Sequence, residues 1–113
     1  MIRSARHSKK LIIPETSFLI SAADSLCRMT GYSKNELTDS ECGYAGLLCE
    51  DDRDIYLSFL RRMMRGDERD YSEKYHIKKK DGNTIFVKDS VNVKREKDGK
   101  LIGYSVVVDI TDS

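Results

Sequence analysis

Three cysteines and two histidines are the residues of this chain whose types could support metal binding or nucleophilic chemistry. Cys27, Cys42 and Cys49 form no CxxC pair, and His7 and His76 lie far from them and from each other. Zinc sites need ligand pairs at short spacing, which is missing here, so no metal site is expected. An odd number of cysteines without a pairing pattern predicts free thiols in a reducing compartment, and hence a cytoplasmic protein.

Asp89 is the carboxylate whose position is most informative. It stands between Val87 and Val91 in a segment where apolar residues alternate with polar ones. Alternate residues of a strand share a face, so this pattern places a carboxylate among valines. Burial of a carboxylate is costly unless it has a partner. We therefore expect either a bulge that turns Asp89 outward, or a cation, hydroxyl or ligand that meets it inside the domain as at a polar hook.

Motifs of the common enzyme classes are not found in the sequence. It contains no glycine-rich phosphate loop, no GxSxG and no HExxH. Many of its carboxylates fall at expected helix starts and turns, where they have structural roles. These observations predict a chain without catalytic activity of its own.

Length and composition indicate one soluble globular domain over residues 1–113, with residues 1–8 as a flexible or linker segment. The 113 residues are 39% hydrophobic and 35% charged, and 20 basic against 19 acidic residues give a net charge of +1. This balance provides no field for nucleic acid. No apolar run approaches the length of about 20 residues that spans a membrane, and no secretion signal opens the chain.

The elements that must position these residues follow from periodicity and from capping signals. The strongest helical pattern covers residues 52–65, where the apolar residues at helical spacing are Ile55, Tyr56, Phe59, Leu60, Met63 and Met64. A shorter helix is expected over residues 24–30. Ser33 and Glu36 have the spacing of a capping box. Residues 38–49 are expected to be irregular.

Strands are expected at residues 9–13, 17–22, 71–79, 84–94 and 101–110. The last three are joined by Asp81-Gly82 and Asp98-Gly99, and such turns predict positive φ at both residues of each pair. In the last strand, alternation predicts that one shared face is apolar and points to the core, through Ile102, Tyr104, Val106, Val108 and Ile110. The expected fold class is α+β, with a five-stranded antiparallel sheet covered on one face by short helices and one longer helix.

Four segments, in this order and at sensible spacing, resemble the PAS domain family over nearly the whole chain. They are CRMTGYSKNEL (27–37), LLCEDDRD (47–54), YSEKYHIKKKDGNTIFVKD (71–89) and DGKLIGYSVVVDIT (98–111). The chain departs from the family pattern at three places: Ala23 replaces a frequent Asn, Cys49-Glu50 a usual His-Pro, and Phe86 a usual Trp.

The resemblance implies a regulatory sensor module for signal transduction, as in two-component systems. Such modules precede output domains of the histidine kinase or diguanylate cyclase type, so this chain is expected to be a regulatory fragment of a longer protein whose output domain follows it, and that parent could be membrane-anchored. The family further implies that Asp109 and Thr111 couple the sheet to the output linker. As structural residues, the same pair would form a cap at the strand end.

Small ligands of PAS-like domains bind between the long helix and the sheet. The residues of this chain that the resemblance places there are Leu26, Met29, Tyr44, Leu48, Phe59, Met63, Tyr75, Asp89, Val91, Tyr104 and Val106. The alternative is that these residues only pack as core. A second alternative is a ligand-free homodimerisation module, because Phe86 falls on the otherwise polar sheet face.

The same resemblance raises haem and flavin as possible cofactors. Haem would need a ligand on the long helix, which has no histidine; Met63 is better explained as core, and His76 as a surface residue. Light-sensing LOV domains carry a reactive cysteine in GRNCRFLQ, and Cys42 falls at that place. Its surroundings are DSECGYAG, however, and Lys88 stands where an Asn is expected. Neither haem nor flavin is therefore favoured, and flavin photochemistry at Cys42 is kept as an alternative.

Overall fold

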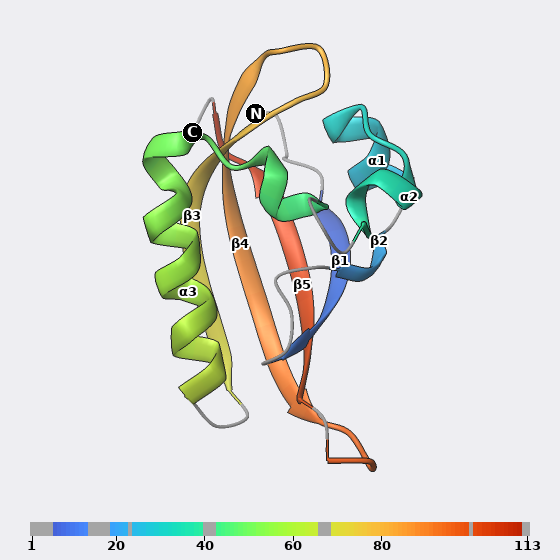
Figure 1. Ribbon diagram of the computed structural model, residues 1–113, viewed down its shortest axis with the longest axis vertical. Coiled ribbons are helices and arrows are strands. Elements are labelled where there is room, and N and C mark those ends of the chain that lie inside the picture. Colours follow the sequence, from blue (N-terminus) through green and yellow to red (C-terminus); the bar gives the residue numbers. More distant parts are fainter. Residues whose placement is uncertain are drawn as a thin grey trace.

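The computed structural model describes residues 6–13, 19–22, 24–39, 43–65, 69–99 and 101–111, with side chains from Asp24 onward (Figure 1). Strands and helices alternate in blocks along the chain. In order, they are β1 (Arg6–Ile13), β2 (Leu19–Ala22), α1 (Asp24–Thr30), α2 (Lys34–Leu37), η1 (Tyr44–Leu47), η2 (Glu50–Asp52), α3 (Arg53–Arg65), β3 (Asp70–Lys78), β4 (Thr84–Arg95) and β5 (Leu101–Asp109).

The sheet is antiparallel, and its strand order is β2-β1-β5-β4-β3. β1 pairs with β5 from Arg6↔Val108 to Ile13↔Leu101, so the amino-terminal hairpin joins the carboxy-terminal meander. β1 begins at Arg6, three residues before the expected start, and β2 is Leu19–Ala22, while residues 17 and 18 of the expected strand lie outside the described residues. The α+β class expected from the sequence is confirmed.

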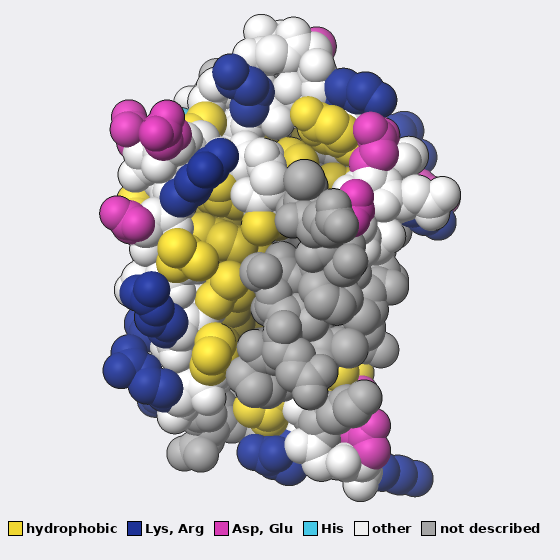
Figure 2. Space-filling view, viewed as in Figure 1, with side chains coloured by type: hydrophobic (Ala, Val, Ile, Leu, Met, Phe, Trp, Pro, Cys, Tyr) yellow, Lys and Arg dark blue, Asp and Glu magenta, His cyan; other side chains and the backbone are white. Residues whose placement is uncertain are grey.

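Helix α3 covers the meander on one face and is amphipathic. Its four buried residues are Tyr56, Phe59, Leu60 and Met63. In Figure 2, hydrophobic side chains appear on the side of this helix that faces the sheet, and Lys and Arg on its outer side. Ile55 and Met64 were expected on the buried stripe, but they are 39% and 46% exposed. The apolar stripe is therefore narrower than the sequence pattern indicated.

β5 presents the opposite face from the one expected. Val107 is fully buried and Ser105 is 3% exposed on the side of the core, whereas Tyr104 is 39% exposed on the other side. The pairing explains this orientation, because Asp89 lies opposite Val107 and Val91 lies opposite Ser105. β5 is a central strand between β1 and β4, so both of its faces carry apolar residues and alternation alone could not choose between them.

The Asp-Gly turns differ in type from the expectation. Gly82 has φ 92° and Gly99 has φ 87°, but no described residue other than glycine has positive φ. In the first turn, Gly82 N donates to Lys79 O at 2.9 Å and Lys79 N donates to Asn83 O at 2.8 Å. This is a type I turn followed by a glycine in the left-handed region, so only the glycine of each pair needs positive φ.

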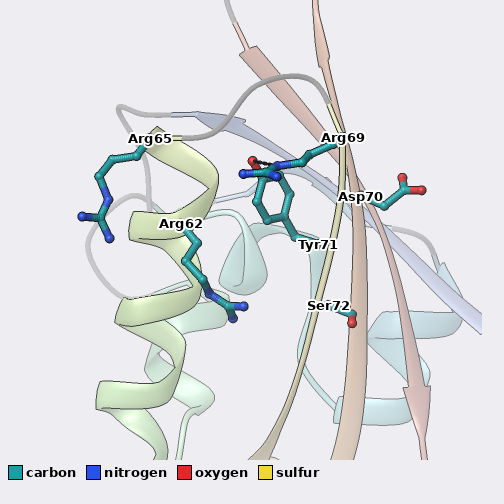
Figure 3. Close-up of a pocket in the computed structure, with 6 residues that line it drawn as sticks. All are labelled: Arg62, Arg65, Arg69, Asp70, Tyr71 and Ser72. Carbon is teal, nitrogen blue, oxygen red and sulfur yellow. Dashed lines mark hydrogen bonds between the residues drawn. The ribbon is translucent and has the colours of Figure 1, made fainter.

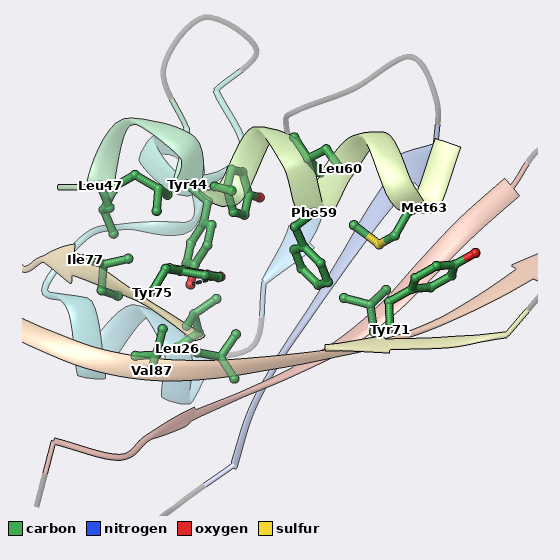
Figure 4. Packing of buried hydrophobic residues seen from close by; sticks show 14 of the residues in the cluster. Leu26, Tyr44, Leu47, Phe59, Leu60, Met63, Tyr71, Tyr75, Ile77 and Val87 are labelled. Carbon is green, nitrogen blue, oxygen red and sulfur yellow. Dashed lines mark hydrogen bonds between the residues drawn. The ribbon is translucent and has the colours of Figure 1, made fainter. Parts of the chain in front are cut away.

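The core lies between the helices and the inner face of β3, β4 and β5 (Figure 4). Its largest fully buried side chains are Tyr44, Tyr75, Phe59, Leu26, Leu37, Met63, Ile77, Val87 and Val91. α1 covers the part of the sheet near β1, and α3 covers the part near β3 (Figure 1). Two of the largest core residues are tyrosines, and their hydroxyl groups must therefore find partners inside the domain.

Candidate functional site

A polar cluster lies at the centre of this core, and Asp89 on β4 is its carboxylate. Asp89 is fully buried. The hydroxyl of Tyr75, on the neighbouring strand β3, donates to Asp89 Oδ2 at 2.6 Å. Ser105, on the other neighbouring strand β5, donates its hydroxyl to Asp89 Oδ1. Each oxygen of the carboxylate thus accepts a hydroxyl proton from a different strand.

Tyr44 extends the cluster to the helical layer. Its hydroxyl lies 2.9 Å from the hydroxyl of Tyr75. Because Tyr75 gives its proton to Asp89, Tyr44 is the donor in this second bond. The sequence places Tyr44 there through Gly43, whose φ of 49° and ψ of −150° are nearly restricted to glycine. A Cβ at Gly43 would also approach the carbonyl oxygen of Asp39 to 2.6 Å.

Three tyrosine rings form the wall of the cluster. The Tyr56 ring from α3 meets the Tyr75 ring edge to face, with centroids 5.2 Å apart and planes at 74°. The Tyr44 and Tyr75 rings meet in the same way at 6.4 Å and 76°. Edge-to-face contacts of this kind stabilise aromatic pairs beyond the area that they bury. The cluster therefore joins η1 to β3 through rings and hydroxyl groups, and α3 to β3 through rings.

The acidity of these phenols reflects their surroundings. Burial raises the pKa of Tyr44, Tyr56 and Tyr75, and the nearby negative charge of Asp89 raises each pKa further. All three therefore remain protonated at neutral pH and can act as hydrogen-bond donors. Chemically, the arrangement is a buried acceptor surrounded by hydroxyl donors.

Eight of the predicted pocket residues are buried on the inner side of the domain. They are Leu26, Tyr44, Leu48, Phe59, Met63, Tyr75, Asp89 and Val91. Met29 is half-buried and packs against the same core. The prediction was wrong for Tyr104 and Val106, which lie on the outer face of the sheet because β5 is turned the other way.

Ser105 and Tyr56 belong to the cluster but were missed as site residues. The signal that could have found Ser105 is the pairing of β5 with β4, which was not deduced from the sequence. Tyr56 was recognised as part of the helical stripe, and its position on the buried side of α3 brings it to the Tyr75 ring. Both residues depend on a tertiary relationship rather than on a local motif.

Asp109 and Thr111 form a cap at the end of β5. Thr111 N and Thr111 Oγ1 both donate to Asp109 Oδ1, at 2.9 Å and 2.5 Å. Thr111 Oγ1 in turn accepts from the backbone N–H of Phe86 at 3.0 Å. The cap therefore fixes the carboxy-terminal end of β5 to the start of β4.

A second feature is an open surface groove of about 510 Å³ where α3 ends and β3 begins (Figure 3). Arg62 pairs with Glu73 at 2.7 Å. Arg69 lies over the Tyr71 ring, 5.3 Å from its centroid, and donates to its hydroxyl. Positive side chains are favourable at the carboxy-terminal end of a helix, because the backbone dipoles leave negative charge there. Arg62 and Arg65, in the last turn of α3, are thus explained by the stability of the helix.

The described residues named above for haem or flavin binding do not lie together in one site. Met63 is 1% exposed in the core, Lys88 is exposed on β4, and Cys42 lies outside the described residues. Among the described residues, no three His, Cys, Asp or Glu side chains gather in a group that could hold a metal ion. Nor does any helix in the described ranges have both the length and the apolar character needed to cross a membrane.

A sheet of this order, with helices on one face and a polar cluster between the two layers, defines an α+β domain. A family model described as PAS fold matches residues 19–108. The chain therefore belongs to the PAS family, which confirms the resemblance seen in its sequence. PAS domains are regulatory sensors of signalling proteins, so this chain is a sensory module. A search of curated proteins found no match.

Solved structures with the same fold come from several signalling proteins. The N-terminal domain of a diguanylate cyclase with a PAS/PAC sensor from Marinobacter aquaeolei is 16% identical, with a TM-score of 0.78 over 95% of this chain and 96% of that chain. A PAS domain from a two-component sensor histidine kinase is 18% identical, with a TM-score of 0.70 over 92% and 84%. An RNA-binding Light-Oxygen-Voltage receptor is 16% identical, with a TM-score of 0.71 over 96% and 30%. At these identities, the likeness shows the fold alone.

Proposed function

We propose that this chain binds a small ligand at the Asp89 cluster and thereby controls an output domain. The observation that carries the proposal is a fully buried carboxylate that accepts hydrogen bonds from two strands. A core made only for stability gains little from a buried charge, since apolar residues of similar volume are often equally stabilising. Ionisable groups with such surroundings are concentrated at functional sites.

The ligand class follows from the groups of the cluster. Asp89 is an acceptor when ionised, and a ligand with an amine, amide or hydroxyl group would donate to it. Such a ligand would compete with the Tyr75 hydroxyl, which occupies Asp89 Oδ2. Binding would then release Tyr75 and, through the bond between their hydroxyl groups, Tyr44. A ligand at Asp89 is thereby coupled to β3 and to η1.

The output would leave the domain at Asp109 and Thr111. Asp89 lies directly opposite Val107 in the β4–β5 pairing, two residues before Asp109. A displacement of β4 relative to β5 would therefore reach the cap formed by Asp109 and Thr111. We expect an output domain of the histidine kinase or diguanylate cyclase type, and no catalysis by this module itself. We expect the domain to lie in the cytoplasm, where thiols such as Cys27 and Cys49 stay reduced.

Native mass spectrometry of the purified domain tests the proposal. The protein is incubated with a mixed metabolite extract, desalted and measured beside two variants treated in the same way. We expect a bound small mass on the unaltered domain and on Tyr56→Phe, and its loss in Asp89→Asn. The absence of an adduct from all three proteins, or an adduct that Asp89→Asn retains, would contradict ligand binding at this cluster.

A second candidate function, homodimerisation, is favoured by the outer face of the sheet. An open groove of about 450 Å³ crosses β3, β4 and β5 there, and Tyr104 and Val106 line it. Tyr104 is 39% exposed, and Phe86 is half-buried on the same face. A second copy of this chain would cover these apolar side chains, which are surrounded by polar ones.

Light scattering across a dilution series tests this second candidate. Tyr104→Glu should shift the population toward monomer, because a carboxylate would be buried in the interface. Asn35→Glu, which places the same charge on exposed α2, should leave the mass unchanged. A domain that remains monomeric at millimolar concentration would contradict the proposal.

A further inference from the structure

A single carboxylate, Asp52, contacts both the backbone and the side chain of His76. Asp52 Oδ2 accepts from the backbone N–H of His76 at 2.5 Å and lies 2.7 Å from His76 Nδ1. The Asp52 side chain is only 13% exposed, whereas His76 remains 47% exposed. The carboxylate is therefore held in place, and the imidazole remains accessible to protons from the solvent.

This contact fixes the start of α3 to the edge of the sheet. β3 is an edge strand, and Cys49 N donates to the carbonyl oxygen of His76 at 3.1 Å. Leu48 also forms an isolated bridge with Ile77. The segment 48–52 thus contacts β3 at His76 and Ile77, and α3 begins at the next residue. The position of α3 relative to β3 therefore depends on the contacts that His76 makes with Cys49 and Asp52.

On its other side, His76 contacts Phe86 on β4, and the backbone of Phe86 binds residues that follow β5. His76 lies directly opposite Phe86, and the two rings stack with centroids 4.5 Å apart and planes at 29°. The backbone of Phe86 binds the last described residues: its N–H donates to Thr111 Oγ1 at 3.0 Å, and its carbonyl accepts from Ile110 N at 2.8 Å. In Figure 1 the first turn of α3 and the end of β5 lie at the same end of the sheet.

We propose that His76 is a proton-sensitive contact that couples the start of α3 to the carboxy-terminal end of β5. Protonation adds a positive charge to the imidazole, so its hydrogen bond to the Asp52 carboxylate becomes an ion pair, which is stronger than the same bond from a neutral imidazole. It also places a cation against the face of the Phe86 ring. Both effects tighten the series Asp52–His76–Phe86–Thr111, and loss of the proton loosens it.

The charged groups around His76 act in both directions. They are Glu50, Asp51 and Asp52 on η2, Arg53 and Asp54 on α3, Lys74 and Lys78 on β3, Lys88 on β4 and Asp109 on β5. Lys74 and Lys78 share the outer face of β3 with His76 and oppose its protonation, but both are exposed and screened by solvent. Asp52 lies at hydrogen-bond distance from the imidazole, and its side chain is only 13% exposed.

This contact is separate from the Asp89 cluster and needs no ligand. It rests on the proposed function only where it takes the end of β5 as the path to an output domain. Histidine side chains gain and lose a proton between about pH 5 and 8, whereas carboxyl groups ordinarily titrate below this range. A structural response within this range that is lost in His76→Gln can therefore be assigned to His76.

NMR spectroscopy of the isolated domain tests the coupling. The imidazole signals of His76 and the backbone amides of Ile110 and Thr111 are followed from pH 5 to pH 8. We expect the two amides to shift with the same midpoint as the imidazole. They should not respond in His76→Gln, and they should respond normally in His7→Gln, which removes the other histidine.

A third variant separates coupling from folding. Phe86→Leu keeps the backbone bonds of Phe86 but removes the ring that stacks on His76, so the imidazole should still titrate while the amide response is reduced or lost. The proposal is overturned if His76 titrates and the amides of Ile110 and Thr111 do not move, or if they move equally in His76→Gln. Neither result would bear on ligand binding at Asp89.

Discussion

Tyr75 donates a 2.6 Å hydrogen bond from its hydroxyl to Asp89 Oδ2, and both side chains are fully buried. The bond joins β3 to β4 inside the core. A hydrogen bond to a charged group contributes more to stability than a neutral one, and the loss of one partner leaves the other without compensation. The stability of the domain should therefore depend strongly on the polar atoms of this pair.

Tyr75→Phe and Tyr56→Phe form a matched pair, because each removes one buried hydroxyl from the same cluster. The Tyr56 hydroxyl has no hydrogen-bond partner within the described part of the chain. We expect Tyr75→Phe to lower the free energy of unfolding by about 2–3 kcal/mol. Tyr56→Phe should leave it unchanged or raise it slightly. Urea denaturation at pH 7 measures both, and equal losses would show that the bond to Asp89 has no special importance.

The raised pKa of each buried tyrosine predicts a loss of stability at alkaline pH. An unfolded chain ionises these phenols near the ordinary pKa of 10.0, whereas the folded chain holds the protons to higher pH. Stability is therefore complete below pH 10 and falls above it, by about 1.4 kcal/mol per pH unit for each tyrosine. Urea denaturation between pH 9 and 11 should give a shallower fall for Tyr56→Phe. If the free energy of unfolding falls equally steeply with pH in Tyr56→Phe and in the unaltered domain, ionisation of Tyr56 does not cause the fall.

Gly43 positions Tyr44, and its substitution should be more harmful than that of a turn glycine. At Gly43 an added Cβ would meet the backbone of Asp39 at 2.6 Å, whereas at Gly82 it would meet nothing within 4 Å. Both have positive φ, which costs about 1–2 kcal/mol for a residue with a Cβ. We expect Gly82→Ala to lose this amount in thermal unfolding and Gly43→Ala to lose clearly more. The reverse order would contradict the assigned backbone constraint.

The capping box of α2 should be measurable in isolation from the core. Ser33 Oγ accepts from Glu36 N at 3.1 Å, and Glu36 Oε1 accepts from Ser33 N at 2.9 Å. Ser33→Ala should reduce stability by about 1 kcal/mol. Asn35→Ala, at an exposed position of the same helix, should have a much smaller effect. If chemical denaturation shows no difference between the two variants, the box does not stabilise this helix.

Local signals in the sequence predicted the elements that depend on neighbouring residues. The helix over 24–30, the capping box at Ser33 and the turn positions at Gly82 and Gly99 all agree with the structure, because each depends on interactions within a few residues. Of the two alternatives left open for Asp89, the structure shows the inward one, in which hydroxyl groups meet the carboxylate.

Tertiary relationships could not be read in the same way. β5 is apolar on both faces, so its orientation is decided by the pairing of Val91 with Ser105 rather than by alternation. Asp52 and His76 are 24 residues apart, and nothing in either segment indicates the other. Tyr44 follows a glycine in an irregular region, and its bond to Tyr75 appears only when η1 lies over β3.

The most direct test of ligand sensing is an amide and tyrosine side-chain NMR spectrum of the domain with and without a metabolite extract to which it binds. The account predicts that the shifted signals are centred on Tyr44, Tyr75, Asp89 and Ser105, and that Asp89→Asn abolishes them. Signals that shift only on the outer face, around Tyr104 and Val106, or a response that Asp89→Asn preserves, would contradict a sensor site inside the core.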